Sequence, residues 1–197
     1  EDLVSLKDYV ARMKEGQEAI YYITGDDLQT LATSPHLEGF RARGVEVLLL
    51  SDPVDDFWLS AVFEYEGHAL TSATRGAADL SNLGEEEAKD EADETEPAGD
   101  SELATLIALV KQTLGEAVKD VRTTDRLTDS AVCLVADDGD MDMRLERMLK
   151  AHNQLDTNSV RILEINPKHD LIKNMAGAAT KGGAADDLAD LAFLLLD

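Results

Sequence analysis

Acidic residues follow two predicted strands, and they are the side chains best placed to do chemistry. Asp26 and Asp27 come after the apolar run 19–24, and Asp52 and Asp55 come after the apolar run 45–50. Enzymes with Rossmann-like folds form their sites at the carboxyl ends of parallel strands. These carboxylates therefore support one candidate function, a hydrolase or transferase. Gly25-Asp26-Asp27 contains a single glycine, which favours a plain turn there.

A second group of acids crowds the turn before a predicted helix and could suggest a calcium loop. Its members are Asp137, Asp138, Asp140 and Asp142. An EF-hand loop read from Asp138 needs glycine at its sixth position and glutamate at its twelfth, where this chain has Met143 and Leu149. Capping of the helix amino end is the preferred interpretation, because acids are favourable there.

The remaining motifs indicate no catalytic, cofactor-binding or metal-binding residue. Residues 177–184, GAATKGGA, have the glycine spacing of a P-loop, but Gly183 and Ala184 replace its Lys-Ser/Thr pair. A flexible connection is expected there. The four histidines lack zinc spacing. The single Cys133 excludes a disulfide within the chain and indicates a buried thiol in a reducing compartment.

The first half of the chain predicts an α/β unit. Ser5 can cap a helix that ends at Gly16. The runs 19–24 and 45–50 are predicted strands, and residues 34–44 form the helix between them, which makes a parallel βαβ unit. A short helix around Trp58 follows, and then a hairpin that turns near Gly67.

A run of acids divides the chain. Residues 84–100 carry many acids and no large apolar residue, so they predict an exposed linker. The second half, residues 101–197, predicts an α+β domain. It has a helix capped by Asp100 or Ser101, extended runs at 121–124, 131–136 and 160–166, and a final helix from Asp186 or Asp187.

The charge of the chain excludes two classes of partner. The formal net charge is −23, so nucleic acid and anionic membrane surfaces would be repelled. No apolar run reaches the roughly 20 residues that span a bilayer, and Glu1-Asp2 does not open a signal peptide. A cytoplasmic location is expected.

Two apolar groups have both a structural and a functional interpretation. Trp58 follows Asp55 and Asp56, and packing in the core is the expected role of its neighbour Phe57. The other group lies within residues 141–149 and comprises Met141, Met143, Leu145, Met148 and Leu149. Core packing explains any such stripe, but flexible methionine side chains also suit a surface that accepts many partners.

Four stretches of the chain closely resemble one family. They are YVARMKEGQEAIYYITG at 9–25, VLLLSDPVDDFW at 47–58, KDVRTTDRLTDSAVCLVAD at 119–137 and RILEINPKHDLIK at 161–173. The matches occur in the family's order in both halves of the chain. The chain resembles the heat-shock protein 90 chaperones, in their bacterial HtpG form.

The resemblance implies an architecture. Residues 1–83 would be the distal α/β part of the middle domain, 84–100 an acidic linker, and 101–197 the α+β dimerisation domain with its last helix truncated. The ATPase domain would lie upstream, so the resemblance implies a chain that is not an enzyme and binds no cofactor, although the full-length family uses ATP and magnesium.

The resemblance also implies partners. Unfolded or partly folded clients would bind Trp58, Met141, Met143, Leu145, Met148 and Leu149. Dimerisation would use Leu188, Leu191, Leu195 and Leu196, and the homodimer is expected to be weak or absent here. The resemblance thus predicts the client-binding and dimerisation portion of an ATP-dependent chaperone, with the hydrolase or transferase as the alternative.

Overall fold

The computed structural model describes residues 4–76, 80, 83, 98–137, 140, 146, 149–150, 159–181 and 185–196. The chain divides into two compact units. The described residues up to 83, together with 140, 146, 149 and 150, belong to the first unit, and 98–137 and 159–196 belong to the second. The four residues 140, 146, 149 and 150 fall within the sequence-predicted second domain, yet they group with the first unit.

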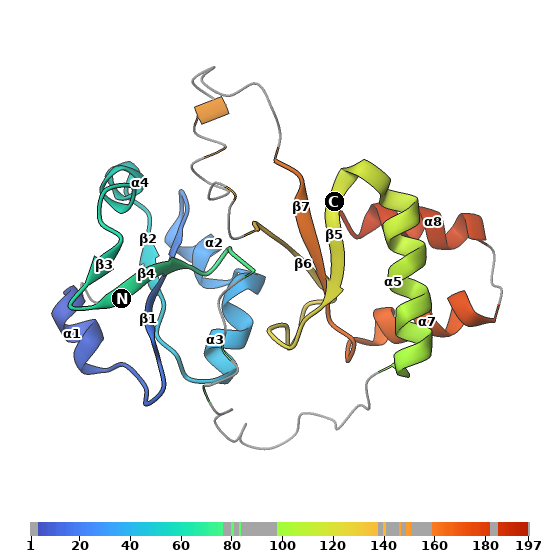
Figure 1. Ribbon diagram of the computed structural model, residues 1–197, viewed down its shortest axis with the longest axis horizontal. Helices are drawn as coiled ribbons and strands as arrows, with labels where there is room; N and C mark the ends of the chain where they lie inside the picture. Colours follow the sequence, from blue (N-terminus) through green and yellow to red (C-terminus); the bar gives the residue numbers. More distant parts are fainter. Residues whose placement is uncertain are drawn as a thin grey trace. The chain divides into compact units, whose positions relative to one another are not determined.

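The first unit is built on a four-stranded sheet (Figure 1). Its strands are β1 (Ala19–Thr24), β2 (Leu48–Leu50), β3 (Glu64–Tyr65) and β4 (His68–Ser72), in the order β2-β1-β4-β3. β1 runs parallel to both β2 and β4, whereas β3 and β4 form an antiparallel hairpin. The turn of the hairpin is Glu66-Gly67, with φ of 51° and 84°, which is the backbone that a two-residue hairpin requires.

Five short helical segments accompany this sheet. They are α1 (Leu6–Ala11), α2 (Leu28–Ala32), the 3₁₀ helix η1 (Pro35–Leu37), α3 (Glu38–Ala42) and α4 (Pro53–Leu59). Ser5 caps α1 as expected, by accepting a hydrogen bond from the Asp8 N–H. Gly25-Asp26-Asp27 lie outside the helices, as a turn would, and α2 follows them because the Asp27 carboxylate accepts hydrogen bonds from the Thr30 N–H and hydroxyl and so caps a helix that the sequence did not predict.

β2 is shorter than the predicted strand 45–50. The Val45 N–H donates to the Phe40 carbonyl oxygen at 2.8 Å, so the start of the apolar run completes the end of α3. The core of this unit lies between the sheet and the helices. The Tyr21 and Phe40 rings pack there, with centroids 4.8 Å apart.

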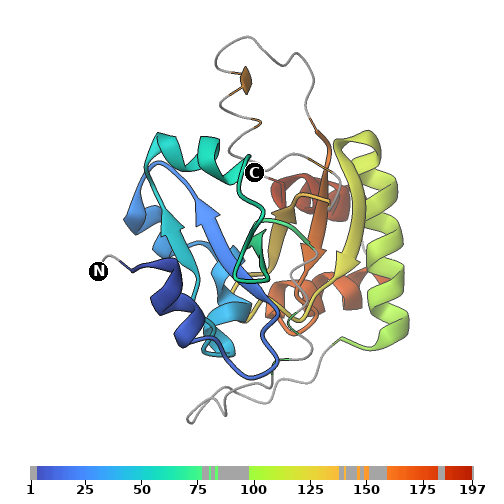
Figure 2. The same cartoon turned by 60° about the vertical axis from the view of Figure 1, so that its left-hand side comes forward.

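The second unit has a three-stranded sheet with helices on one face (Figures 1 and 2). Its strands are β5 (Val118–Thr123), β6 (Val132–Val135) and β7 (Arg161–Ile165), in the order β5-β7-β6. β5 is parallel to β7, and β6 is antiparallel to it. The helices are α5 (Asp100–Leu114), the 3₁₀ helix η2 (Gly115–Ala117), α7 (Asp170–Thr180) and α8 (Ala185–Leu194).

The alternation of β7 separates two sides of this sheet. Leu163 and Ile165 pack in the cluster that contains Leu106 of α5 and Ile172 of α7. Ile162 instead packs with a small cluster formed by Leu127, Cys133 and Val135. Alternate residues of a strand face opposite sides, so the sequence LEI places Glu164 with Ile162 and away from the helices.

Two boundaries differ from the sequence expectations. α7 continues through Gly177 to Thr180, so the first part of the glycine-rich segment is helical and not a loose connection. The acidic segment 84–97 lies outside the described residues. Ala98 is buried, and its N–H donates to the Pro167 carbonyl oxygen at 3.2 Å, so the chain is fixed before α5 begins.

Candidate functional site

The amino end of α4 is fixed by two carboxylates. Asp52 accepts a hydrogen bond from the Val54 N–H at 3.0 Å, and Asp55 accepts one from the Asp52 N–H at 3.1 Å. Together these bonds form a capping box, and Pro53 occupies the first helical turn, where a missing N–H costs nothing. The sequence Asp-Pro-x-Asp therefore sets where α4 starts and which residues it presents.

Trp58 is held on α4 by the same carboxylate. Its indole Nε1–H donates to Asp55 Oδ1 at 2.9 Å, and its side chain is half-buried. Asp55 thus caps the helix with one oxygen and orients the indole with the other. This arrangement leaves part of the Trp58 ring accessible while its polar group is already satisfied.

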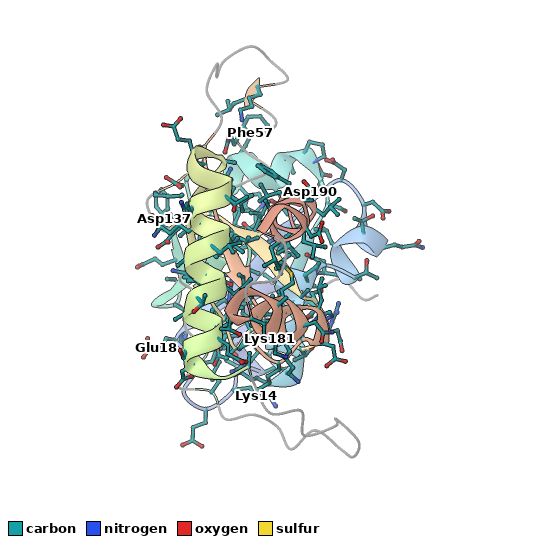
Figure 3. All side chains as sticks on the ribbon, turned by 90° about the vertical axis from the view of Figure 1, so that its right-hand side faces the viewer. Lys14, Glu18, Phe57, Asp137, Lys181 and Asp190 are labelled. Atoms are coloured by element: carbon teal, nitrogen blue, oxygen red, sulfur yellow. The ribbon has the colours of Figure 1, made fainter. Side chains whose placement is uncertain are left out.

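Phe57, the preceding residue, is 63% exposed, so the expectation that it packs in the core is wrong (Figure 3). Three further apolar residues close to it in the chain are also exposed: Val54 at 57%, Val62 at 38% and Phe63 at 70%. We call Val54, Phe57, Val62 and Phe63 the α4 surface. All four fall within ten positions of the chain, which makes them candidates for an interaction surface.

The methionine group is described only at its end. Met141, Met143, Leu145 and Met148 lie outside the described residues, and Leu149 is half-buried. Close to Leu149 in the chain, the buried Glu146 forms an ion pair of 2.5 Å with Lys150. The assignment of this group to client binding stays a prediction.

The predicted dimerisation leucines have different environments. Leu188 is 4% exposed and packs in the core of its own unit, while Leu191, Leu195 and Leu196 are half-buried against the same cluster. The most exposed apolar residues of α8 are Phe193, at 51%, and Leu194, at 65%. The sequence analysis did not single out these two residues. They lie off the stripe formed by Leu188, Leu191 and Leu195, and an apolar residue off the core-facing stripe of a helix is the signal that could have identified them.

The carboxylates of the alternative enzyme hypothesis serve as helix caps. Hydrogen bonds from the Thr30 backbone and hydroxyl lower the pKa of Asp27 below its usual value. Asp52 and Asp55 accept the backbone hydrogen bonds of the capping box at the start of α4. Among the residues that the structure describes, no group of three or more His, Cys, Asp or Glu side chains is arranged to hold a metal ion.

One buried ionic group was not anticipated. Glu164 of β7 is 2% exposed, and its two carboxylate oxygens accept hydrogen bonds from two different guanidinium groups. Arg122 donates to Oε1 at 2.8 Å, and Arg126 donates to Oε2 at 2.6 Å. Through these bonds Glu164 of the central strand β7 holds both β5, which carries Arg122, and the segment after it, which carries Arg126. This role is structural.

None of the helices in the described part of the chain is both long and apolar enough to cross a membrane.

Comparison with known proteins identifies relatives along the whole chain. A family model described as "Hsp90 protein" matches residues 1–197. "Chaperone protein HtpG" of Roseobacter denitrificans is 57% identical over 198 residues, which cover 100% of this chain and 32% of that protein. HtpG of Paramagnetospirillum magneticum is 57% identical over 99% of this chain, and HtpG of Wolbachia pipientis is 43% identical over 99% of it.

The chain spans about a third of the length of the curated relatives it matches. The match corrects one expectation. The prediction that the chain is not an enzyme required the ATPase part of the family to lie outside it. The family model instead covers residues 1–197 in full, and the match to the Roseobacter relative covers 100% of this chain. That prediction is therefore wrong, and the expectation of no cofactor loses its basis with it.

The resemblance seen in the four sequence stretches is confirmed at the level of the family. A family model over the entire chain and relatives at up to 57% identity leave no segment unmatched. This chain belongs to the Hsp90 protein family, with bacterial HtpG chaperones among its relatives.

Proposed function

We propose that this chain binds clients for an HtpG-type chaperone and takes part in joining two copies of it. Its clients are unfolded or partly folded proteins. Within the whole protein, residues 1–83 correspond to the distal middle domain, and residues 101–197 correspond to the dimerisation domain. ATP with magnesium is the nucleotide of the whole protein, and titration of this chain with MgATP decides whether these residues contact it.

The observation that carries the proposal is the exposure of Phe57 beside the half-buried Trp58 on α4. A chaperone must bind many sequences, which requires apolar contacts that remain accessible in the folded protein. Phe57 supplies one such contact at 63% exposure, and Trp58 lies next to it with its indole N–H already bonded. Ordinary core packing would bury Phe57, which is among the largest apolar side chains of the chain.

The second role is supported by α8. Phe193 and Leu194 expose apolar area, while Leu188 on the same helix is buried in the core. An amphipathic helix needs only one apolar face to pack on its own domain. We therefore propose that the outer apolar residues of α8 contact a second copy of the chain.

The test of client binding is suppression of aggregation of a chemically unfolded substrate by the purified chain. Phe57→Ser and Trp58→Ala should each protect less than the parent. Leu171→Ser, at an apolar residue of α7 that is 37% exposed, is the matched control and should protect fully. If the Phe57→Ser and Trp58→Ala variants fold and protect as well as the parent, client binding at α4 is refuted.

A further inference from the structure

Phe63 is the most exposed large apolar residue that the structure describes, at 70%. We infer that Phe63 and Val62 are binding residues, and that the α4 surface selects extended segments whose apolar residues are flanked by lysine or arginine. This inference rests on the proposed client-binding function and adds to it both a pair of residues and a substrate class.

The exposure of these side chains is built into the fold. The Val62 N–H donates to the Trp58 carbonyl oxygen at 2.8 Å, which ties this residue to the end of α4. The Phe63 carbonyl oxygen accepts a hydrogen bond from the Leu70 N–H at 2.9 Å, which ties it to β4. Because the backbone is fixed on both sides, the two side chains stay presented to solvent beside α4.

The Asp, Glu, Lys and Arg residues of this stretch of the chain are all acidic. No lysine or arginine occurs between Arg43 and Arg75, whereas Asp52, Asp55, Asp56, Glu64 and Glu66 lie within residues 52–66. Glu64 and Glu66 are exposed next to Phe63. Acidic groups at the rim of an apolar surface attract basic segments and disfavour acidic ones.

The position of β3 favours an extended occupant. Glu64 and Tyr65 form the edge strand of the sheet, and Phe63 directly precedes them. An extended segment can lie along such an edge while its apolar side chains contact Phe63 and Val62. Segments of this kind are exposed in unfolded proteins, and those with basic flanks match the charge of the rim.

The test uses two fluorescein-labelled peptides of twelve residues with the same phenylalanines and leucines in the centre. One peptide carries lysine and arginine at both ends, and the other carries aspartate and glutamate. Fluorescence anisotropy with the full 197-residue chain should show tighter binding of the basic peptide, by about tenfold at low salt, and the difference should shrink at high salt.

Variants locate the contact. Phe63→Ser should raise the Kd for the basic peptide about tenfold, because one buried aromatic contact is lost. Leu171→Ser should leave it unchanged. The double variant Glu64→Gln, Glu66→Gln should reduce the preference for the basic peptide about two- to fivefold. Phe63→Ala, with unchanged circular dichroism, repeats the first test with a smaller change in polarity.

The outcomes separate this inference from the proposed function. If Phe57→Ser abolishes protection but Phe63→Ser and Phe63→Ala bind the basic peptide like the parent, Phe63 is not a binding residue and client binding stands. Equal binding of the two peptides overturns the charge selectivity. If the parent neither protects the substrate nor binds either peptide, the proposed function itself fails.

Discussion

The hydroxyl group of Tyr9 donates a hydrogen bond of 2.6 Å to the backbone carbonyl oxygen of Glu46, 37 residues further along the chain. The Tyr9 hydroxyl oxygen in turn accepts hydrogen bonds from the Tyr21 N–H at 3.0 Å and from Gln17 Nε2 at 2.9 Å. Tyr9 is 1% exposed, so one buried hydroxyl joins α1, the start of β1 and the segment before β2. Three backbone and side-chain groups depend on it.

Tyr9→Phe should lower the free energy of unfolding of the first unit by about 1–3 kcal/mol, because it leaves buried hydrogen-bonding groups without their partner. Urea denaturation followed by the fluorescence of Trp58, the single tryptophan, reports on this unit. Arg12→Ala is the control. Arg12 forms an ion pair of 2.8 Å with Glu46, but both side chains are well exposed, so its removal should cost under about 1 kcal/mol. Equal effects of the two changes would contradict this role of Tyr9.

The stability of the first unit should fall at high pH through Tyr9. Burial is the main cause that raises the pKa of Tyr9 to about 12, and the nearby Glu46 charge adds to it. An unfolded tyrosine ionises near pH 10, so between about pH 10 and pH 12 only the unfolded state loses the proton readily. The parent should therefore lose roughly 2–3 kcal/mol of unfolding free energy across this window. Tyr9→Phe should lack this part of the loss, and parallel pH profiles for the two proteins would refute the assignment.

Breaking the buried ionic group of the second unit should lower its free energy of unfolding far more than breaking an exposed ion pair. Glu164→Ala leaves Arg126, whose side chain is 11% exposed, without its partner, and should cost about 3–5 kcal/mol. Lys111→Ala breaks an ion pair of 2.6 Å with Asp120 in which both side chains are exposed, and should cost under about 1 kcal/mol. Denaturation followed by circular dichroism measures both. A loss below about 1 kcal/mol for Glu164→Ala would show that this ionic group is dispensable.

The capping box of α4 should affect both stability and client binding. Asp52→Ala removes the acceptor of the Val54 N–H and should cost about 0.5–2 kcal/mol. Because α4 carries Phe57 and Trp58, protection of an unfolded substrate should also fall. Asp52→Asn keeps an oxygen that can accept the same bond and should behave nearly like the parent. If the alanine variant shows faster exchange of the α4 amides but undiminished protection, client binding does not need an ordered α4.

The outer residues of α8 provide a test of self-association. We expect the chain to form dimers whose fraction rises with concentration, and Phe193→Ser with Leu194→Ser should shift the equilibrium toward monomer. Fully burying two large apolar side chains contributes about 3–6 kcal/mol, so the dissociation constant should rise at least tenfold. Sedimentation velocity over a range of concentrations measures it. Phe57→Ser serves as the control, and a dimer that both variants leave unchanged would mean that another surface joins the two copies.

Local sequence signals predicted the elements whose causes lie within a few residues. The apolar run Ala19–Thr24 is β1, Ser5 caps α1, and Gly67 lies in the hairpin turn. These features depend on side chains and backbone angles close together in the chain. A signal of the same kind was overlooked at Asp27, whose carboxylate caps α2, a helix that the sequence analysis did not predict.

The sequence by itself also determined the family, because four ordered stretches carry information from the whole chain. Only the tertiary structure decided which apolar residues are accessible. Phe57 was expected in the core and is exposed, whereas Leu188, which was assigned to a partner, is buried in its own unit. Both residues have the composition and spacing of packing residues. Their exposure depends on which surfaces distant segments cover, as in the pairing of β1 with β4 and the enclosure of Glu164 by Arg122 and Arg126. Such contacts form between residues far apart in sequence, and no local pattern records them.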